Sequence, residues 1–183
     1  MNAWGTAAGA FAGTLVLTTV LRAAGEFRLT RMDLPFLLGT AVTANRAHAK
    51  AIGYLMHFAN GEVFAFVYYA VFLAIGHAGW WLGALFGLVH GTFAGTALVN
   101  ILLPLIHPRM GSPLTSAPKV ALLEPPGFLM LNYGPSTPLV TVLAHAGFGA
   151  IVGGFTSLDP HGAHSNLSVQ VTGSSWVTEV GCE

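Results

Sequence analysis

Four long apolar segments set the main limit on how this chain can fold. They cover residues 4–22, 47–76, 79–103 and 138–158. Each is long enough for a helix that crosses a bilayer, which needs about 20 mostly apolar residues. Only 8% of the 183 residues are charged, whereas a soluble domain normally carries about 25%. The sequence therefore predicts an all-α, multi-pass membrane protein whose four helices form a bundle in the lipid bilayer.

Charge, cysteine content and missing motifs exclude several classes of function. The formal net charge is zero, which argues against a nucleic-acid partner. The single cysteine, Cys182, has no second cysteine for an internal disulfide. No basic residue precedes the first apolar segment, so we expect a retained span rather than a cleaved signal peptide. The phosphate-binding, HExxH and GxSxG motifs are missing, so we expect no enzymatic activity.

The basic residues predict how the chain is oriented. All seven lie in two connections, one after the first span and one after the third: Arg22, Arg28, Arg31, Arg46, Lys50, Arg109 and Lys119. Basic residues beside membrane spans remain on the cytoplasmic side. We therefore expect both connections in the cytoplasm and both termini outside.

The two basic connections also contain apolar stretches. In the first, at 31–42, Asp33 stands directly before Leu-Pro, which favours a helix start, and the flanking arginines predict a short interfacial helix. The second, at 104–137, is rich in proline, which forbids a long helix. Because residues 128–131 in it are apolar, we expect it to fold back over the bundle, with His107 in a surface loop.

The chain changes character after residue 158. Apolar and polar residues alternate on either side of a Thr-Gly-Ser-Ser stretch, which predicts a possible β-hairpin. We therefore divide the chain into a membrane domain, 1–158, and a non-cytoplasmic tail, 159–183.

Glycines recur at every fourth residue in three of the spans. They are Gly5, Gly9 and Gly13 in the first, Gly79, Gly83, Gly87, Gly91 and Gly95 in the third, and Gly149 and Gly153 in the fourth. In lipid, small residues let helices approach closely and gain dispersion contacts. The rows allow two interpretations. One is an interface with a second copy or with a larger membrane complex, and the other is internal packing of the bundle. We favour internal packing, because the third span needs several neighbours in any four-helix bundle.

Three histidines lie within spans at similar depth. Counted from the middle of each span, His90 lies about 1.5 Å to the outer side, and His145 and His57 about 4.5 and 7.5 Å to the cytoplasmic side. Each stands beside a glycine of the same helix face, so we expect all three to face protein. Ionisable residues within spans are costly and typically mark functional sites. Glu62 is a further candidate, as a proton acceptor, although it lies about 140° around the helix from His57.

Several chemistries remain open for these histidines. Three neutral imidazoles can bind copper or zinc, and two can ligate a haem. Histidine with glutamate can relay protons or hold a quinone headgroup. The simpler interpretation, which we favour, is that each forms a hydrogen bond between helices worth about 0.6–2 kcal/mol, with no cofactor. The leading hypothesis is therefore a non-enzymatic structural or accessory subunit, packed through its glycine faces against itself or a larger complex. The alternative is a cofactor-, proton- or ion-handling protein.

The order of these features resembles that in a group of small bacterial inner-membrane proteins with four spans. The resemblance rests on the glycine-rich first span and on four motifs: MDLPFLLGT (32–40), GWWLGALFGLVHG (79–91), HPRM (107–110) and LEPPGFLMLNYG (123–134). It covers about residues 1–157 and implies a four-span fold in a bacterial inner membrane. No activity is attached to the group, so the resemblance implies no catalytic residues. The tail departs from its pattern, and we expect an extension that docks an external partner.

Overall fold

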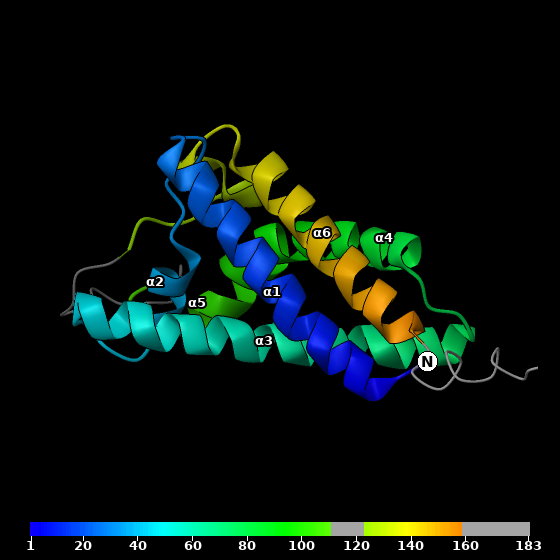
Figure 1. Cartoon of the computed structure of the whole chain (residues 1–183). Helices are drawn as coiled ribbons and strands as arrows, with labels where there is room; N and C mark the ends of the chain where they lie inside the picture. The colour runs from blue at the N-terminus through cyan, green and yellow to red at the C-terminus, as the bar shows by residue number, and fades with distance from the viewer. Residues whose placement is uncertain (111–122, 159–183) are drawn as a thin grey trace, which may run out of the picture.

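A computed structural model describes residues 1–110 and 123–158, and this part of the chain is all-helical, without a strand. Four helical stretches are long and apolar enough to cross a membrane. They are α1 (Ala3–Glu26), α3 (Arg46–Ile75), α6 (Thr137–Ser157), and α4 (Trp80–Phe93) continued by the π-helix η1 (Ala94–Leu102) and by α5 (Leu103–Ile106). The predicted fold class is confirmed (Figure 1). The expected β-hairpin lies outside the described residues.

Helix α6 lies at the centre of the bundle. It packs along α1 on one side and α4 on the other, whereas α3 packs mainly on α1 and on the short helix α2 (Leu34–Gly39). Figure 1 shows α1 and α3 crossing near the chain's N-terminus and spreading apart toward the other end, where α2 lies between them. One of the two cavities described below lies at that end, between α1, α2 and α3.

The two ends of the bundle differ in charge. Helix α1 ends, and α3 and α6 begin, at the end that we call the basic end, because all described lysines and arginines lie there: Arg22, Arg28, Arg31, Arg46, Lys50 and Arg109. At the opposite end the backbone N–H of Asn2 donates to the carbonyl of Thr156, over 3.0 Å. The beginning of α1 and the end of α6 therefore lie together, away from the basic end.

The glycine rows lie where helices of the same chain touch. A Cβ atom at Gly83 or Gly87 of α4 would overlap a backbone carbonyl of α6, and one at Gly149 would overlap the carbonyl of Gly83. On α1, a Cβ atom at Gly9 would lie 2.8 Å from the Cβ of Phe155 of α6. These rows bring α1 and α4 against opposite sides of α6. The structure thus accounts for these glycines by internal packing, the interpretation that the sequence favoured.

The predicted short helix is present as α2. The carboxylate of Asp33 accepts a hydrogen bond from the backbone N–H of Phe36, over 3.1 Å, so Asp33 caps the helix as predicted. Two glycines press α2 onto α3: a Cβ atom at Gly39 or Gly53 would overlap a backbone carbonyl of the other helix. Helix α2 is therefore held against α3 by backbone contact, and its position at the membrane surface remains a prediction.

The expectation that His107 lies in a surface loop is wrong. Its side chain is 2% exposed, and its Nε2 atom lies 2.9 Å from the carbonyl oxygen of Leu37 on α2. Its Nδ1 atom accepts a hydrogen bond from the backbone N–H of Arg109, over 3.1 Å. His107 is buried because helix α2 covers the end of α5. The sequence around His107 does not show this contact, since α2 lies far away along the chain. The fold-back of the apolar stretch is confirmed, since Met130 in the 3₁₀ helix η2 (Phe128–Tyr133) is 2% exposed.

Candidate functional site

The three intramembrane histidines line one cavity of about 270 Å³ in the middle of the bundle. We call this cavity the chamber. His57 reaches it from α3, His90 from α4 and His145 from α6. Most of the remaining lining is apolar and includes Leu17, Met56, Phe64, Val99, Met130 and Phe148. The structure therefore places the predicted histidines together, facing protein rather than lipid.

His90 connects two spans. Its Nδ1 atom lies 3.1 Å from the phenolic oxygen of Tyr68 on α3. Its ring lies against the ring of Phe64, with centroids 3.9 Å apart, and meets the ring of His145 edge-on at 4.8 Å. In the described part of the chain, His90 is thus the one chamber histidine that forms a hydrogen bond to another spanning helix.

His145 has one ring nitrogen free for a ligand. Its Nδ1 atom lies 2.8 Å from the carbonyl oxygen of Thr141, one turn earlier on α6. A carbonyl oxygen only accepts, so Nδ1 carries the proton and Nε2 of the neutral ring is an acceptor. The side chain fits because Gly91 faces it: a Cβ atom at Gly91 would lie 3.0 Å from the Cβ of His145. This glycine of α4 therefore makes room for a histidine of α6.

Three buried polar atoms around the chamber have no hydrogen-bond partner in the described structure. They are the Oγ1 atoms of Thr14 and Thr141 and the Nε2 atom of His57, and all three residues line the chamber. Leaving such a group unpaired costs about 1–3 kcal/mol, and native structures contain few of them. Because all three residues line the chamber, a water or a ligand bound there is a candidate partner for these atoms.

The π-helix η1 forms one wall of the chamber, through Ala94, Leu98, Val99 and Leu102. Such helices are rare and often occur at functional sites. Within this helix the Nδ2 atom of Asn100 lies 3.2 Å from the carbonyl oxygen of Gly95 and 3.0 Å from that of Thr96. Asn100 also donates to the carbonyl of Gly127, over 3.0 Å, next to η2. Asn100 therefore supports the chamber wall from outside, whereas Asn60 lines the chamber itself.

The chamber opens toward the outer surface of the bundle. Helix α3 does not pack closely on η1 or α5. Leu102 and Ile106 line the chamber, yet they are 45% and 79% exposed. An opening lined by apolar side chains at the level of a span faces the hydrocarbon of the bilayer. A lipophilic molecule can therefore reach the chamber from the membrane.

The geometry does not favour a metal or haem. Among residues 1–110 and 123–158, no three His, Cys, Asp or Glu side chains lie close enough together to hold a metal ion. The rings of His90 and His145 are in edge contact, which leaves no room for a haem between them. Glu62, the expected proton acceptor, does not line the chamber.

Comparison with models of protein families, with curated protein sequences and with solved structures gives no match. The resemblance to bacterial four-span proteins therefore stays a prediction from the sequence. What can be said of function rests on the chamber and its surroundings.

Proposed function

We propose that this membrane protein binds a small lipophilic molecule of the quinone class in the chamber. The observation that supports the proposal is the set of three unpartnered polar atoms, on Thr14, His57 and Thr141, around a mostly apolar cavity. A quinone is an apolar ring with carbonyl oxygens that accept hydrogen bonds. The Thr14 hydroxyl faces Gly61 and both threonine hydroxyls are inaccessible in this structure, so each must rotate to donate to such an oxygen. The Nε2 atom of His145 can accept from the hydroxyl of the reduced form.

The size and access of the chamber agree with such a ligand. Small-molecule sites are mostly apolar cavities of about 300–1,000 Å³ with a few placed polar groups, and the chamber of about 270 Å³ lies just below that range. This favours a compact headgroup with one ring. The opening beside Leu102 and Ile106 leaves a path for an apolar tail into the bilayer.

The chamber supports this proposal better than the glycine rows support an accessory subunit. The rows on α1, α4 and α6 pack against one another within the chain. They are therefore covered and offer no surface to a second copy or a larger complex. No chemical reaction is part of the proposal, in keeping with the expectation of a non-enzymatic protein.

We also propose that the protein lies in a bacterial inner membrane with the basic end in the cytoplasm. The described lysines and arginines gather at one end, and the start of α1 and the end of α6 lie at the other. An alkaline phosphatase fused after residue 158 should then be active, because this enzyme folds only outside the cytoplasm. The same fusion within the connection after α5 should be inactive, and the reverse pattern would overturn the orientation.

The binding proposal is tested with a benzoquinone that carries one isoprenyl unit, added to the full chain in lipid nanodiscs. We expect saturable binding by calorimetry. Thr14→Val and Thr141→Val keep the side-chain shape and remove one donor each, so each should weaken binding about tenfold, the equivalent of about 1.4 kcal/mol. Thr19→Val is the matched control, because its exposed hydroxyl bonds the carbonyl of Leu15 on the same helix.

Two results would overturn the proposal. One is a probe that shows no saturable binding to the native chain. The other is a chain in which Thr14→Val and Thr141→Val bind the probe as tightly as Thr19→Val. Both chamber variants should stay folded without ligand, since the hydroxyls that they lose have no partner in the described structure.

A further inference from the structure

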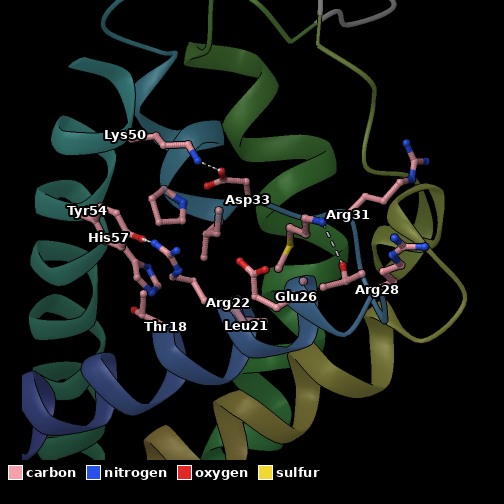
Figure 2. Close-up of a pocket in the computed structure, with 15 residues that line it drawn as sticks. Thr18, Leu21, Arg22, Glu26, Arg28, Arg31, Asp33, Lys50, Tyr54 and His57 are labelled. Atoms are coloured by element: carbon pink, nitrogen blue, oxygen red, sulfur yellow. Dashed lines mark hydrogen bonds and ion pairs between the residues drawn. The ribbon is translucent and has the colours of Figure 1, made fainter. Parts of the chain in front are cut away.

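A second cavity, of about 560 Å³, lies at the basic end between α1, α2 and α3. We call it the vestibule. Figure 2 shows Arg22 reaching across it from α1 to Tyr54 on α3, where its Nη1 atom donates to the phenolic oxygen over 3.0 Å. Lys50 and Asp33 form an ion pair over 2.8 Å at its rim. Arg28 and Arg31 also belong to its lining, although their side chains extend away from the other lining side chains in Figure 2. Because Glu26 and Asp33 line the vestibule beside Arg22 and Lys50, the charges around it are of both signs.

The vestibule is a place for water. The side chains of Lys50 and Asp33 are 44% and 41% exposed, and Arg22 and Glu26 are also exposed. Charged groups remain ionised only where water or a close partner solvates them. Four charged side chains on the walls of one open cavity therefore indicate that it is continuous with the solution at the basic end.

His57 stands between the vestibule and the chamber. Three residues line both cavities, namely Met32, Leu34 and His57, and His57 alone of the three is polar. Its side chain is 8% exposed and its Nε2 atom is one of the three unpartnered atoms. Figure 2 shows its ring beside Tyr54 and Thr18, at the inner end of the vestibule.

The bundle is closed between the chamber and the opposite end. Phe72, Phe148 and Val152 are each at most 2% exposed there. The ring of Phe72 stacks on that of Phe86, with centroids 5.3 Å apart. Among the described residues, this layer is apolar and tightly packed, so water has no comparable route to the chamber from that end.

We propose that the vestibule gives the chamber access to water from the basic end alone, and that His57 exchanges protons between this water and the molecule in the chamber. A neutral imidazole accepts a proton at one ring nitrogen and releases one from the other. The charged and titratable groups around His57 are Arg22 and Glu26 of α1, Asp33 before α2, Lys50 and Tyr54 of α3, His90 of α4 and His145 of α6. The proton exchange by His57 rests on the proposed function, whereas the access of water to the chamber does not.

The access is tested by His57→Cys in a chain whose native Cys182 is replaced by serine. The protein is placed in liposomes of known orientation and treated with a membrane-impermeant, cationic methanethiosulfonate. Because only the thiolate reacts, modification needs water. We expect His57→Cys to react from the basic end about tenfold or more faster than the control Ala65→Cys, which lies two turns further along the same face of α3 and is 0% exposed.

The proton exchange is tested on the native chain, which avoids any folding defect of the cysteine variant. Histidine labelled with ¹⁵N is introduced, and the ring signals of His57 are assigned by their loss in His57→Gln. We expect these signals to shift when the pH changes on the basic side of the liposomes, and to stay unchanged when it changes on the other side.

The inference is overturned if His57→Cys reacts no faster than Ala65→Cys, or if the His57 signals follow the pH of the opposite side. Either result leaves the proposed function standing, provided that the benzoquinone still binds in a Thr14-dependent way. Conversely, one-sided access without benzoquinone binding would overturn the proposed function and the proton step, and leave the access route in place.

Discussion

The Nδ1 atom of His90 lies 3.1 Å from the phenolic oxygen of Tyr68, and this contact joins α4 to α3 at the level of the chamber. The two helices do not otherwise pack closely along their backbones. Aromatic edges surround the bond: the ring of Tyr68 meets that of Phe86 at 5.7 Å and that of Phe148 at 6.0 Å. Tyr68 therefore links α3 to α4 and α6 at this level, whereas α3 packs mainly on α1 and α2.

Tyr68→Phe should lower the free energy of unfolding by about 0.6–2 kcal/mol, the range for hydrogen bonds between spanning helices. The ring contacts with Phe86 and Phe148 remain, so the loss reports the hydroxyl alone. Titration with a denaturing detergent, followed by circular dichroism, measures it. Tyr69→Phe is the control, because the Tyr69 hydroxyl has no hydrogen bond within the described residues. Equal stability of the two variants would contradict the role given to Tyr68.

The features that could be predicted from the sequence are those determined by residues close together along the chain. Long apolar runs predicted the four spans, and Asp33 before Leu-Pro predicted α2 and its cap. The common depth of His57, His90 and His145, with glycines beside them, predicted that they face protein. These inferences need only helical geometry and the cost of placing polar groups in lipid.

The features that depend on distant partners could not be predicted in the same way. Thr14 and Thr141 line the chamber only because α1 and α6 pack side by side. In the π-helix at Ala94–Leu102, the amide of Asn100 donates to the carbonyl of Gly127, 27 residues further along the chain. His107 is buried because α2 lies over it.

Gly87→Ala should destabilise the bundle, whereas Gly147→Ala should not. A Cβ atom at Gly87 would overlap the carbonyl of His145 and lie 2.7 Å from the Cα of Ala146, so α4 must move away from α6. Overpacking of this kind costs about 1–3 kcal/mol. A Cβ atom at Gly147 meets nothing within 4 Å, and alanine there should add about 0.5–1 kcal/mol of helix stability. The measurement is the thermal unfolding of both variants compared with the native chain. A destabilised Gly147→Ala or a neutral Gly87→Ala would contradict this packing.

Stability should fall as the pH drops below about 6.5, partly through His107. Burial lowers the pKa of His107 from its ordinary value in the folded chain. Below the unfolded value, the unfolded chain binds a proton that the folded chain does not, so acid favours unfolding. The contribution is at most about 1.4 kcal/mol per pH unit. His107→Gln keeps an amide donor for the carbonyl of Leu37 and does not titrate.

The measurement compares the free energy of unfolding of the native chain and of His107→Gln between pH 8 and pH 5. We expect the two curves to run parallel above pH 7 and to separate below about pH 6.5, with the native chain falling more steeply. Parallel curves over the whole range would show that His107 takes up its proton equally in both states.

Asn100→Asp should disturb the chamber wall without changing the size of the side chain. The amide of Asn100 donates to the carbonyls of Gly95, Thr96 and Gly127, and a carboxylate only accepts. The carbonyls of Gly95, Thr96 and Gly127 then lose a shared side-chain donor, although that of Gly127 still accepts from the backbone N–H of Met130. The loss, with a carboxylate placed beside these carbonyls, should lower the free energy of unfolding by about 1–3 kcal/mol. Because η1 lines the chamber through Ala94 and Leu98, affinity for the benzoquinone probe should fall as well. Asn60→Asp, on α3, is the control for an added carboxylate beside the chamber. If Asn100→Asp keeps both stability and affinity, the π-helix holds its shape without this side chain.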